Sequence, residues 1–224
     1  DFVTISSTGN AQDFGDRTTT GFNLGGISNE TRGAFFGGHD PADRDVIDFV
    51  TIAQTGNAVD FGDLAAASHG IIGCASPTRG VFGGGYTAPT AEVNTIQFIT
   101  IATTGDAKDF GDLIRSTHNM GSASNSIRGL FAGGSQSPNK EIQSITIASL
   151  GNAVFFGDLT VARQSDDGVS SPVRCVFGGG YEPGNSSVID YVAFATQGDA
   201  VDFGDLVTVR HAPSGVSNAH GGLG

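Results

Sequence analysis

The chain has 224 residues, with 11 basic and 23 acidic side chains and a formal net charge of −12 at pH 7. A chain of this length can bury the core of one all-β domain. The negative charge argues against nucleic acid and anionic membrane surfaces as partners, because both carry charge of the same sign. The apolar runs are too short to span a bilayer, so we predict no transmembrane segment and no membrane insertion.

Taken in chain order, the predicted elements are all strands, and they recur as a unit of four. The chain opens with "DFVTIS" (1–6) and "AQDFGDR" (11–17), which correspond to the third and fourth strands of later units. A complete unit contains a first strand through "SHGIIGCAS" (68–76), a second at "RGVFGGG" (79–85), a third at "NTIQFITIA" (94–102) and a fourth of the type "AVDFGDL" (58–64). The third strand alternates apolar and polar residues, and no stretch has a sustained helical period.

The chain ends with "RHAPSGVSNAHGGLG" (210–224), which matches the first and second strands of a unit. Gly-Asn or Gly-Asp pairs, such as Gly56-Asn57 and Gly105-Asp106, join the third strand to the fourth and suit tight hairpins. These features place the chain in the all-β class.

The motif "DFGD" measures the repeat. Its second aspartate recurs at intervals of 46 to 49 residues, which is typical of a propeller or a solenoid. The five copies are Asp16, Asp63, Asp112, Asp158 and Asp205. Sixteen residues after each aspartate comes an arginine, or glycine in the last copy: Arg32, Arg79, Arg128, Arg174 and Gly221. All variation in length falls between the second and third strands, so we predict one variable loop face on a constant scaffold.

The recurrence also decides the role of the motif. Kinases use Asp-Phe-Gly once, to hold magnesium, together with a catalytic loop and a glycine-rich loop. Here the motif recurs in every unit, and Phe155 replaces its first aspartate in one copy. We therefore predict a structural element in which the phenylalanine packs between blades and the second aspartate accepts hydrogen bonds or pairs with the repeated arginine. The phenylalanines are Phe14, Phe61, Phe110, Phe156 and Phe203.

We predict one domain, a five-bladed β-propeller of four-stranded antiparallel blades. Its complete blades are expected at 17–64, 65–113, 114–159 and 160–206. Residues 1–16 and 207–224 are expected to form the closing blade together, which would leave no exposed sheet edge. The alternative is a longer parent chain with more blades.

The unit around "SHGIIGCASPTRGVFGGGYTAPTAEVNTIQFITI" resembles the kelch family of β-propeller repeats in its polar first strand, its Gly-Gly doublet and its apolar third strand. Kelch repeats place tryptophan on the fourth strand, where this chain has phenylalanine. The phrase "GVFGGG…NTIQFITIATTGDAKDFGDL" resembles repeat arrays in structural or tail-fibre-like proteins of marine tailed phages, especially cyanophages. This resemblance implies a viral protein located in the virion or outside the cell.

The residue six positions after the motif aspartate is a candidate site. It is Phe22, His69, His118, Gln164 or His211 in the five units. If the first strands are innermost, His69, His118 and His211 could converge on a transition metal. The alternative is that these residues pack or hydrogen-bond at the strand start, and we predict no metal and no other cofactor. Cys74 and Cys175 occupy different positions in the repeat and are too few for a disulfide framework, so we expect buried, reduced thiols.

The variable loops, at 39–45, 86–94, 135–143 and 181–187, are the predicted binding face. Their aromatic and polar side chains suit sugar rings, although ordinary solvated loops remain the alternative. The candidate ligand-binding residues are Tyr86, Tyr181, His39, Asp40, Glu182 and Asn185. Both tyrosines follow Gly-Gly-Gly, which we expect to let a partner approach the backbone. Asp40, Asp43 and Asp45 do not match a calcium loop.

No nucleophile elbow, zinc-protease motif, phosphate-binding loop or paired-cysteine motif occurs, so we predict no enzyme. The expected function is a virion recognition or decoration module that binds a host-surface glycan or protein, or other virion proteins. The alternatives are a multivalent propeller lectin and a propeller scaffold for protein–protein assembly. Because no two loops are alike, the first is favoured over a lectin with equal sites. We also noted the missing start: the chain begins at Asp1 without a signal peptide, as a processed or excised piece would.

Overall fold

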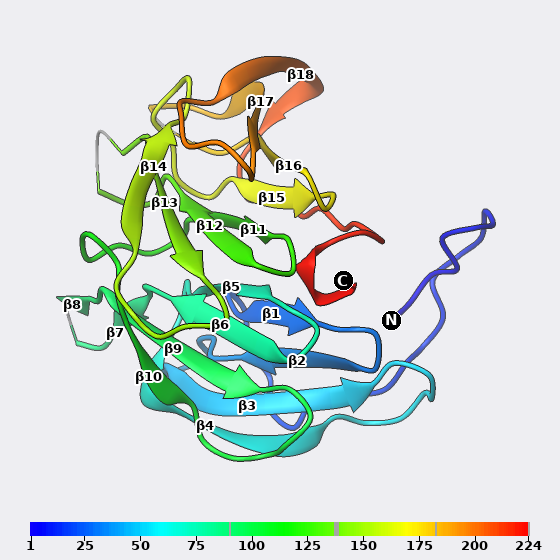
Figure 1. Cartoon of the computed structure of the whole chain (residues 1–224). Helices are drawn as coiled ribbons and strands as arrows, with labels where there is room; N and C mark the ends of the chain where they lie inside the picture. Colours follow the sequence, from blue (N-terminus) through cyan, green and yellow to red (C-terminus); the bar gives the residue numbers. More distant parts are fainter. Residues whose placement is uncertain (90, 137–138, 182, 224) are drawn as a thin grey trace.

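The computed structural model describes residues 1–89, 91–136, 139–181 and 183–223. Figure 1 shows four antiparallel sheets, each made of four strands that follow one another in the chain. We call these sheets blades 1 to 4. They confirm the predicted all-β, propeller-like architecture and the predicted order of strands within a blade.

Blade 1 contains β1 (Gly25–Ser28), β2 (Arg32–Phe36), β3 (Arg44–Thr51) and β4 (Val59–Ser68). Blade 2 contains β5 (Ile72–Ala75), β6 (Arg79–Gly83), β9 (Thr95–Thr100) and β10 (Lys108–Asp112). Blade 3 contains β11 (Gly121–Ser124), β12 (Arg128–Ala132), β13 (Glu141–Thr146) and β14 (Val154–Asp158). Blade 4 contains β15 (Asp167–Ser170), β16 (Arg174–Gly178), β17 (Ser186–Ala193) and β18 (Val201–Arg210). A small ladder of β7 (Tyr86–Thr87) and β8 (Ala91–Glu92) lies in the loop of blade 2, and η1 (Gly221–Leu223) is a short 3-10 turn.

Two blades end later than predicted. The strands β4 and β18 continue past the expected boundaries at residues 64 and 206. They do so because their last residues still pair with the start of the third strand, Ser68 with Arg44 and Arg210 with Ser186.

The motif "DFGD" forms a β-bulge. In blade 2, Asp109 pairs with Gln97 and Gly111 pairs with Ile96, so Phe110 is left between the two pairs. Gly111 has a φ of 148°, which favours glycine. A bulge of this kind turns the extra residue away from its own ladder. The phenylalanine is therefore free to pack outside its blade.

Each bulge docks on the next blade. Phe61 of blade 1 is 2% exposed and lies in one core cluster with Ile101 and Ala107 of blade 2. The backbone N–H groups of Gly105 and Ala107 donate to the carbonyls of Phe61 and Asp63 at 2.7 and 2.8 Å. The side chain of the turn residue Asp106 accepts from the N–H of Asp63 at 3.1 Å. The prediction that this phenylalanine packs between blades is confirmed.

The same joint recurs along the chain. Residues 13–16 dock on 56–58, 61–63 on 105–107, 110–112 on 151–153, and 156–158 on 198–200. We call each of these contacts a blade joint.

The repeated arginines strengthen the joints by a route that was not predicted. Arg32 donates to the carbonyl of Ile101 in the next blade at 2.7 Å, and its guanidinium lies 4.4 Å from the ring centre of Phe49. Arg79 does the same with Ile147 and Phe98. Within the described residues these arginines form no ion pair with the motif aspartates, so that part of the prediction is wrong. A carbonyl of the next blade takes the guanidinium instead.

The inner strands surround a cavity of about 360 Å³. It is lined by residues of β1, β5, β11 and β15, and by residues 215–217, mostly glycine, alanine and serine. Ser124 donates its hydroxyl to the carbonyl of Ala75, and Ser170 donates to Ser124, both at 2.8 Å. Small side chains let the strands converge here, and the hydroxyl groups link one blade to the next. The first strand of each blade is therefore innermost, as expected.

The two ends of the chain do not share a sheet among the described residues. The N-terminal segment has a single bridge, between Phe2 and Gln12, and Figure 1 shows it projecting beside the blades. The C-terminal segment runs along β15, where Ser217 donates to the carbonyl of Ser170 at 2.6 Å. It then reaches blade 1, where His220 Nε2 lies 3.2 Å from Ser28 Oγ.

Both cysteines are buried and free, as predicted. Burial raises the pKa of the Cys74 thiol to about 12 and raises the pKa of Cys175 well above its usual value. Both thiols therefore stay protonated at neutral pH and have little reactivity.

Candidate functional site

The variable loops between the second and third strands gather their aromatic, imidazole and carboxylate side chains at one end of the blades. We call this surface the loop face. It is made of Phe22, His39, Asp43, His69, Tyr86, Glu92, His118, Tyr181, Asn185 and His211.

The glycine doublet that ends each second strand positions this face. In blade 2, Gly84 and Gly85 have φ values of 68° and 116°. A Cβ on Gly84 would lie 2.5 Å from the carbonyl oxygen of Thr117, and Gly85 N–H donates to that oxygen at 2.9 Å. The doublet therefore wraps around a carbonyl of its own chain and sets Tyr86 beside His69. The space that we expected a partner to use is taken by the protein itself.

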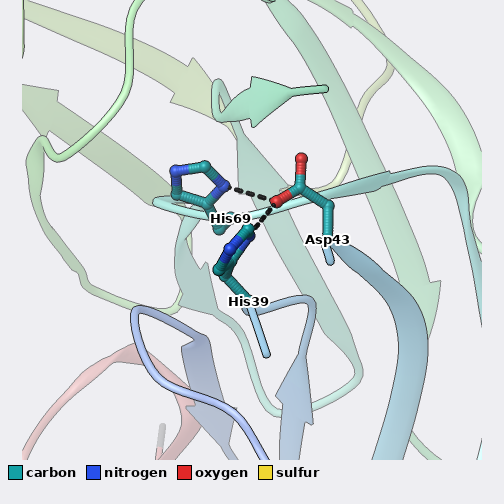
Figure 2. A group of neighbouring side chains, drawn as sticks. All are labelled: His39, Asp43 and His69. Atoms are coloured by element: carbon teal, nitrogen blue, oxygen red, sulfur yellow. Dashed lines mark hydrogen bonds and ion pairs between the residues drawn. The ribbon is translucent and has the colours of Figure 1, made fainter. Parts of the chain in front are cut away.

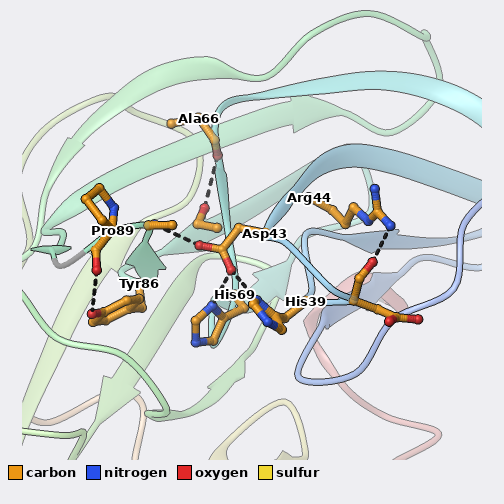
Figure 3. A network of polar contacts seen from close by, with 10 residues as sticks. His39, Asp43, Arg44, Ala66, His69, Tyr86 and Pro89 are labelled. Atoms are coloured by element: carbon orange, nitrogen blue, oxygen red, sulfur yellow. Dashed lines mark hydrogen bonds and ion pairs between the residues drawn. The ribbon is translucent and has the colours of Figure 1, made fainter.

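The aromatic rings form a continuous row over blades 1 and 2. Phe22 and His39 have ring centroids 5.6 Å apart, and His39 and His69 are 5.3 Å apart. Tyr86 follows at 5.3 Å from His69, and His118 lies 5.7 Å from Tyr86. Figure 3 shows His39, His69 and Tyr86 next to one another. The row offers ring faces and edges on a single surface.

Asp43 holds the two central imidazoles. Its Oδ1 lies 2.7 Å from His39 Nδ1 and 2.8 Å from His69 Nδ1, as Figure 2 shows. Its Oδ2 accepts the N–H of Ala88 from the loop of blade 2 at 2.8 Å. Burial alone would raise the pKa of Asp43, but the hydrogen bonds from His39, His69 and Ala88 outweigh burial and lower it. The side chain is 3% exposed, so it is an ionised, buried carboxylate between two imidazoles.

Glu92 plays the same part for His118. The carboxylate lies 3.0 Å from His118 Nδ1 and accepts the hydroxyl of Ser135 at 2.6 Å. Burial tends to raise the pKa of Glu92, while hydrogen bonds from Ser135 and Gln136 bring it below its usual value. Burial lowers the pKa of His118, and Glu92 only partly offsets this. His118 is therefore a neutral imidazole at pH 7.

The predicted ligand-binding residues fall into two groups and a margin. His39 and Tyr86 lie in the aromatic row. Tyr181 and Asn185 form a separate cluster with His211, whose Nδ1 lies 3.2 Å from Asn185 Oδ1. Asp40 stands at the exposed margin, where it accepts the hydroxyl of Thr20 at 2.9 Å, and Glu182 lies outside the described residues.

The three histidines that we considered for a metal do not share one cluster. His69 and His118 have ring centroids 6.3 Å apart. His211 lies instead beside Tyr181, at 6.4 Å. The residue six positions after the motif does occupy a strand-start position next to the loop, which is the alternative given above.

The sequence analysis missed the acceptors of these histidines. Asp43 was weighed only as a calcium ligand, and Glu92 was not considered. A signal was present, because Asp43, Glu92 and Asn185 each precede a partner histidine by 26 residues. The constant interval reflects a loop residue and a strand-start residue that meet at the same place in each blade.

No known protein family and no curated protein matches this sequence. Among the residues that the structure describes, no helix is long and apolar enough to cross a membrane.

Proposed function

We propose that this protein is a non-enzymatic recognition or decoration module of a virion, in which the loop face binds a host-surface glycan or protein. The observation that carries the proposal is the contrast between a constant scaffold and one unequal face. The blade joints repeat with the same hydrogen bonds, whereas the loop residues change from blade to blade. The setting in a virion rests on the phage-like repeat phrase.

The chemistry of the loop face suits a carbohydrate or a polar protein surface. Tyr181 is 44% exposed and has the amide of Asn185 and the imidazole of His211 beside it. Such a tyrosine offers a flat apolar ring for sugar C–H groups, and the neighbouring polar atoms can bind hydroxyl groups. Tyrosine also gives a large contact area at low cost in side-chain entropy.

A multivalent lectin is the second candidate, and its sites would have to be alike. The position after the glycine doublet holds His39, Tyr86, Ser135 and Tyr181 in the four blades. Two of the four are tyrosines and the other two differ in size and charge. This inequality favours a single composite surface over equal sugar sites.

We propose further that the chain closes into a five-bladed ring. Blade 4 carries an unmatched half of a blade joint, because Phe203 is 54% exposed while Phe61, Phe110 and Phe156 are 1–2% exposed. Arg174 lies over the ring of Tyr191 at 4.5 Å, as the arginines of the other blades lie over theirs.

The N-terminal segment carries the other half. Ile5 corresponds to Ile101, and Gly9 to Ala11 correspond to 105–107, the turn that receives a bulge in blade 2. Ile5 is 75% exposed, so both halves present apolar surface. In a closed ring, Ile5 would cover Phe203, and the side chain of Asn10 would accept from the N–H of Asp205.

Replacing Tyr86 and Tyr181 together by alanine is expected to weaken binding of the full chain to host cells or envelope polysaccharide. Two anchor residues of an interface, at about 2 kcal/mol or more, correspond to a loss of roughly 30-fold or more. Surface plasmon resonance or a cell-binding assay measures the loss, and circular dichroism checks that the variant is folded.

The matched control is Leu150→Ala. Leu150 is 61% exposed in the turn between β13 and β14, which lies at the opposite end of the blade from the loop face. Its replacement should leave binding unchanged. If the folded double variant binds as well as the native protein, the proposed recognition role of the loop face is wrong, and assembly with other proteins through another surface becomes the better explanation.

A further inference from the structure

We propose that His39, Asp43 and His69 form a binding site for a divalent transition-metal ion of the zinc class. The proposal rests on the three side chains themselves and is independent of whether the loop face binds a glycan. It also differs from the trio of histidines considered above, since two of its members come from the loop of blade 1.

The geometry is close to that of a metal site. The Nδ1 atoms of His39 and His69 lie 2.7 and 2.8 Å from the same oxygen, Oδ1 of Asp43. The candidate ligand atoms of the three residues all lie within 4.8 Å of one another. Zinc binds imidazole nitrogen and carboxylate oxygen at about 2.0–2.2 Å, so two ligand atoms on a tetrahedral ion are about 3.3 Å apart. Shifts of well under 1 Å at each carboxylate–imidazole contact would therefore let these atoms surround an ion.

The backbone holds the three residues in place from separate elements. His39 and Asp43 face each other across a bridge in the loop between β2 and β3, and His69 follows β4 and bridges to Tyr86. Blade 2 orients the carboxylate, because Ala88 N–H donates to Oδ2 and leaves Oδ1 to the imidazoles. An outer hydrogen bond of this kind fixes a ligand before the ion arrives.

The burial of the three groups gives the site a floor and an opening. The Asp43 side chain is 3% exposed, whereas those of His39 and His69 are 34% and 21% exposed. In Figure 2 both rings turn one edge toward the carboxylate. An ion held by three protein atoms would keep a fourth position for water or for a donor atom of a partner.

The donor set selects the class of metal. Two imidazoles and one carboxylate suit Zn²⁺, Ni²⁺, Co²⁺ or Cu²⁺, while Ca²⁺ and Mg²⁺ prefer oxygen donors alone. The ion would replace the protons that now lie between the imidazoles and Asp43. Binding should therefore weaken as the pH falls and the histidines take up protons.

Two sister positions show what an incomplete site looks like. His118 has Glu92 alone, and His211 has the amide of Asn185 alone. Each offers one imidazole, and within the described ranges His39, Asp43 and His69 are the one group of three that meets the geometry. His211 is therefore a matched control, because it occupies the same place in its repeat as His69.

The test is a titration of the full, chelator-treated chain with Co²⁺ and with Zn²⁺. We expect one Co²⁺ per chain, seen as the visible absorption of a four- or five-coordinate ion and displaced by Zn²⁺. His69→Gln should raise the dissociation constant by about 100-fold or more, since losing even an outer partner of a metal ligand costs about 10–100-fold. Glutamine is a fitting replacement because Gln164 occupies this position in another repeat.

His39→Ala and Asp43→Asn should weaken binding as strongly, and His211→Gln should leave it unchanged. Circular dichroism selects the folded variants, and any one of the three site variants is sufficient for the comparison. The proposal is overturned if the native chain shows no stoichiometric Co²⁺ spectrum. It is equally overturned if a folded site variant binds Co²⁺ as tightly as His211→Gln does.

Discussion

Phe110→Ala is expected to lower the free energy of unfolding by about 3–5 kcal/mol, the usual cost of removing a fully buried phenylalanine ring. Phe110 is 2% exposed and lies in a core cluster with Met120, Ile147 and Ala153 of blades 2 and 3. The bulge brings the ring into this cluster, so its loss opens a cavity at the blade joint. Chemical denaturation followed by circular dichroism measures the change.

Phe155 provides the matched control. It stands beside Phe156 in the motif of blade 3 but is 48% exposed. Phe155→Asp restores the first aspartate that the other copies have, and we expect its effect to stay within about 0.5 kcal/mol, as for most surface substitutions. If Phe110→Ala costs no more than Phe155→Asp, then the motif is not the core element described here.

Asp190→Ala is expected to cost about 3–5 kcal/mol, because it leaves a buried guanidinium without its main partner. Arg163 and Asp190 have side chains with 0% exposure, and Arg163 Nη2 lies 2.9 Å from Asp190 Oδ2. The second carboxylate near the guanidinium is Asp166, 3.7 Å from Nε. Burial raises the pKa of Asp166 to about 7, so it compensates the arginine charge only in part.

Gln97 occupies the position of Asp190 in blade 2 and separates the charge from the hydrogen bond. Its Oε1 accepts the N–H of Ala65 at 2.8 Å, as Asp190 accepts from Thr160, but no arginine lies against it among the hydrogen bonds of the described chain. Gln97→Ala should therefore cost about 1–3 kcal/mol, the range for a buried hydrogen bond that is left unsatisfied. Equal losses at the two positions in urea unfolding would contradict the role assigned to the buried charge.

The repeat made most of the scaffold predictable. Constant intervals around Asp63 and its counterparts located four strands per blade, their order and the loop that varies in length. The burial of Phe61, Phe110 and Phe156 between blades also followed from their recurrence, since a side chain repeated in every unit most simply serves the contact between units. The local mechanism did not follow, because a bulge depends on the register of two strands, which the sequence of one strand does not reveal.

The details of the loop face were less predictable. Tyr86 and His39 were identified from their composition and position, but their common partner Asp43 was not. The carboxylate meets His69 across two loops whose paths depend on the glycine doublet and on backbone hydrogen bonds. The contact of Arg32 with the carbonyl of Ile101 was missed for a similar reason, because a backbone acceptor leaves no mark on the sequence.

The central structural claim is that every "DFGD" bulge joins one blade to the next and that the chain carries both halves of a fifth joint. The most direct test is a distance between two spin labels, one at Thr8 and one at Val201, in the full chain at low concentration. Thr104 and Val59 occupy the same two positions of the intact joint between blades 1 and 2 and serve as an internal ruler. Cys74 and Cys175 are buried and should escape labelling. The account predicts that double electron–electron resonance gives the same narrow, short distance for both pairs. A long or broad distance for the Thr8–Val201 pair, beside a short one for the Thr104–Val59 pair, would contradict ring closure.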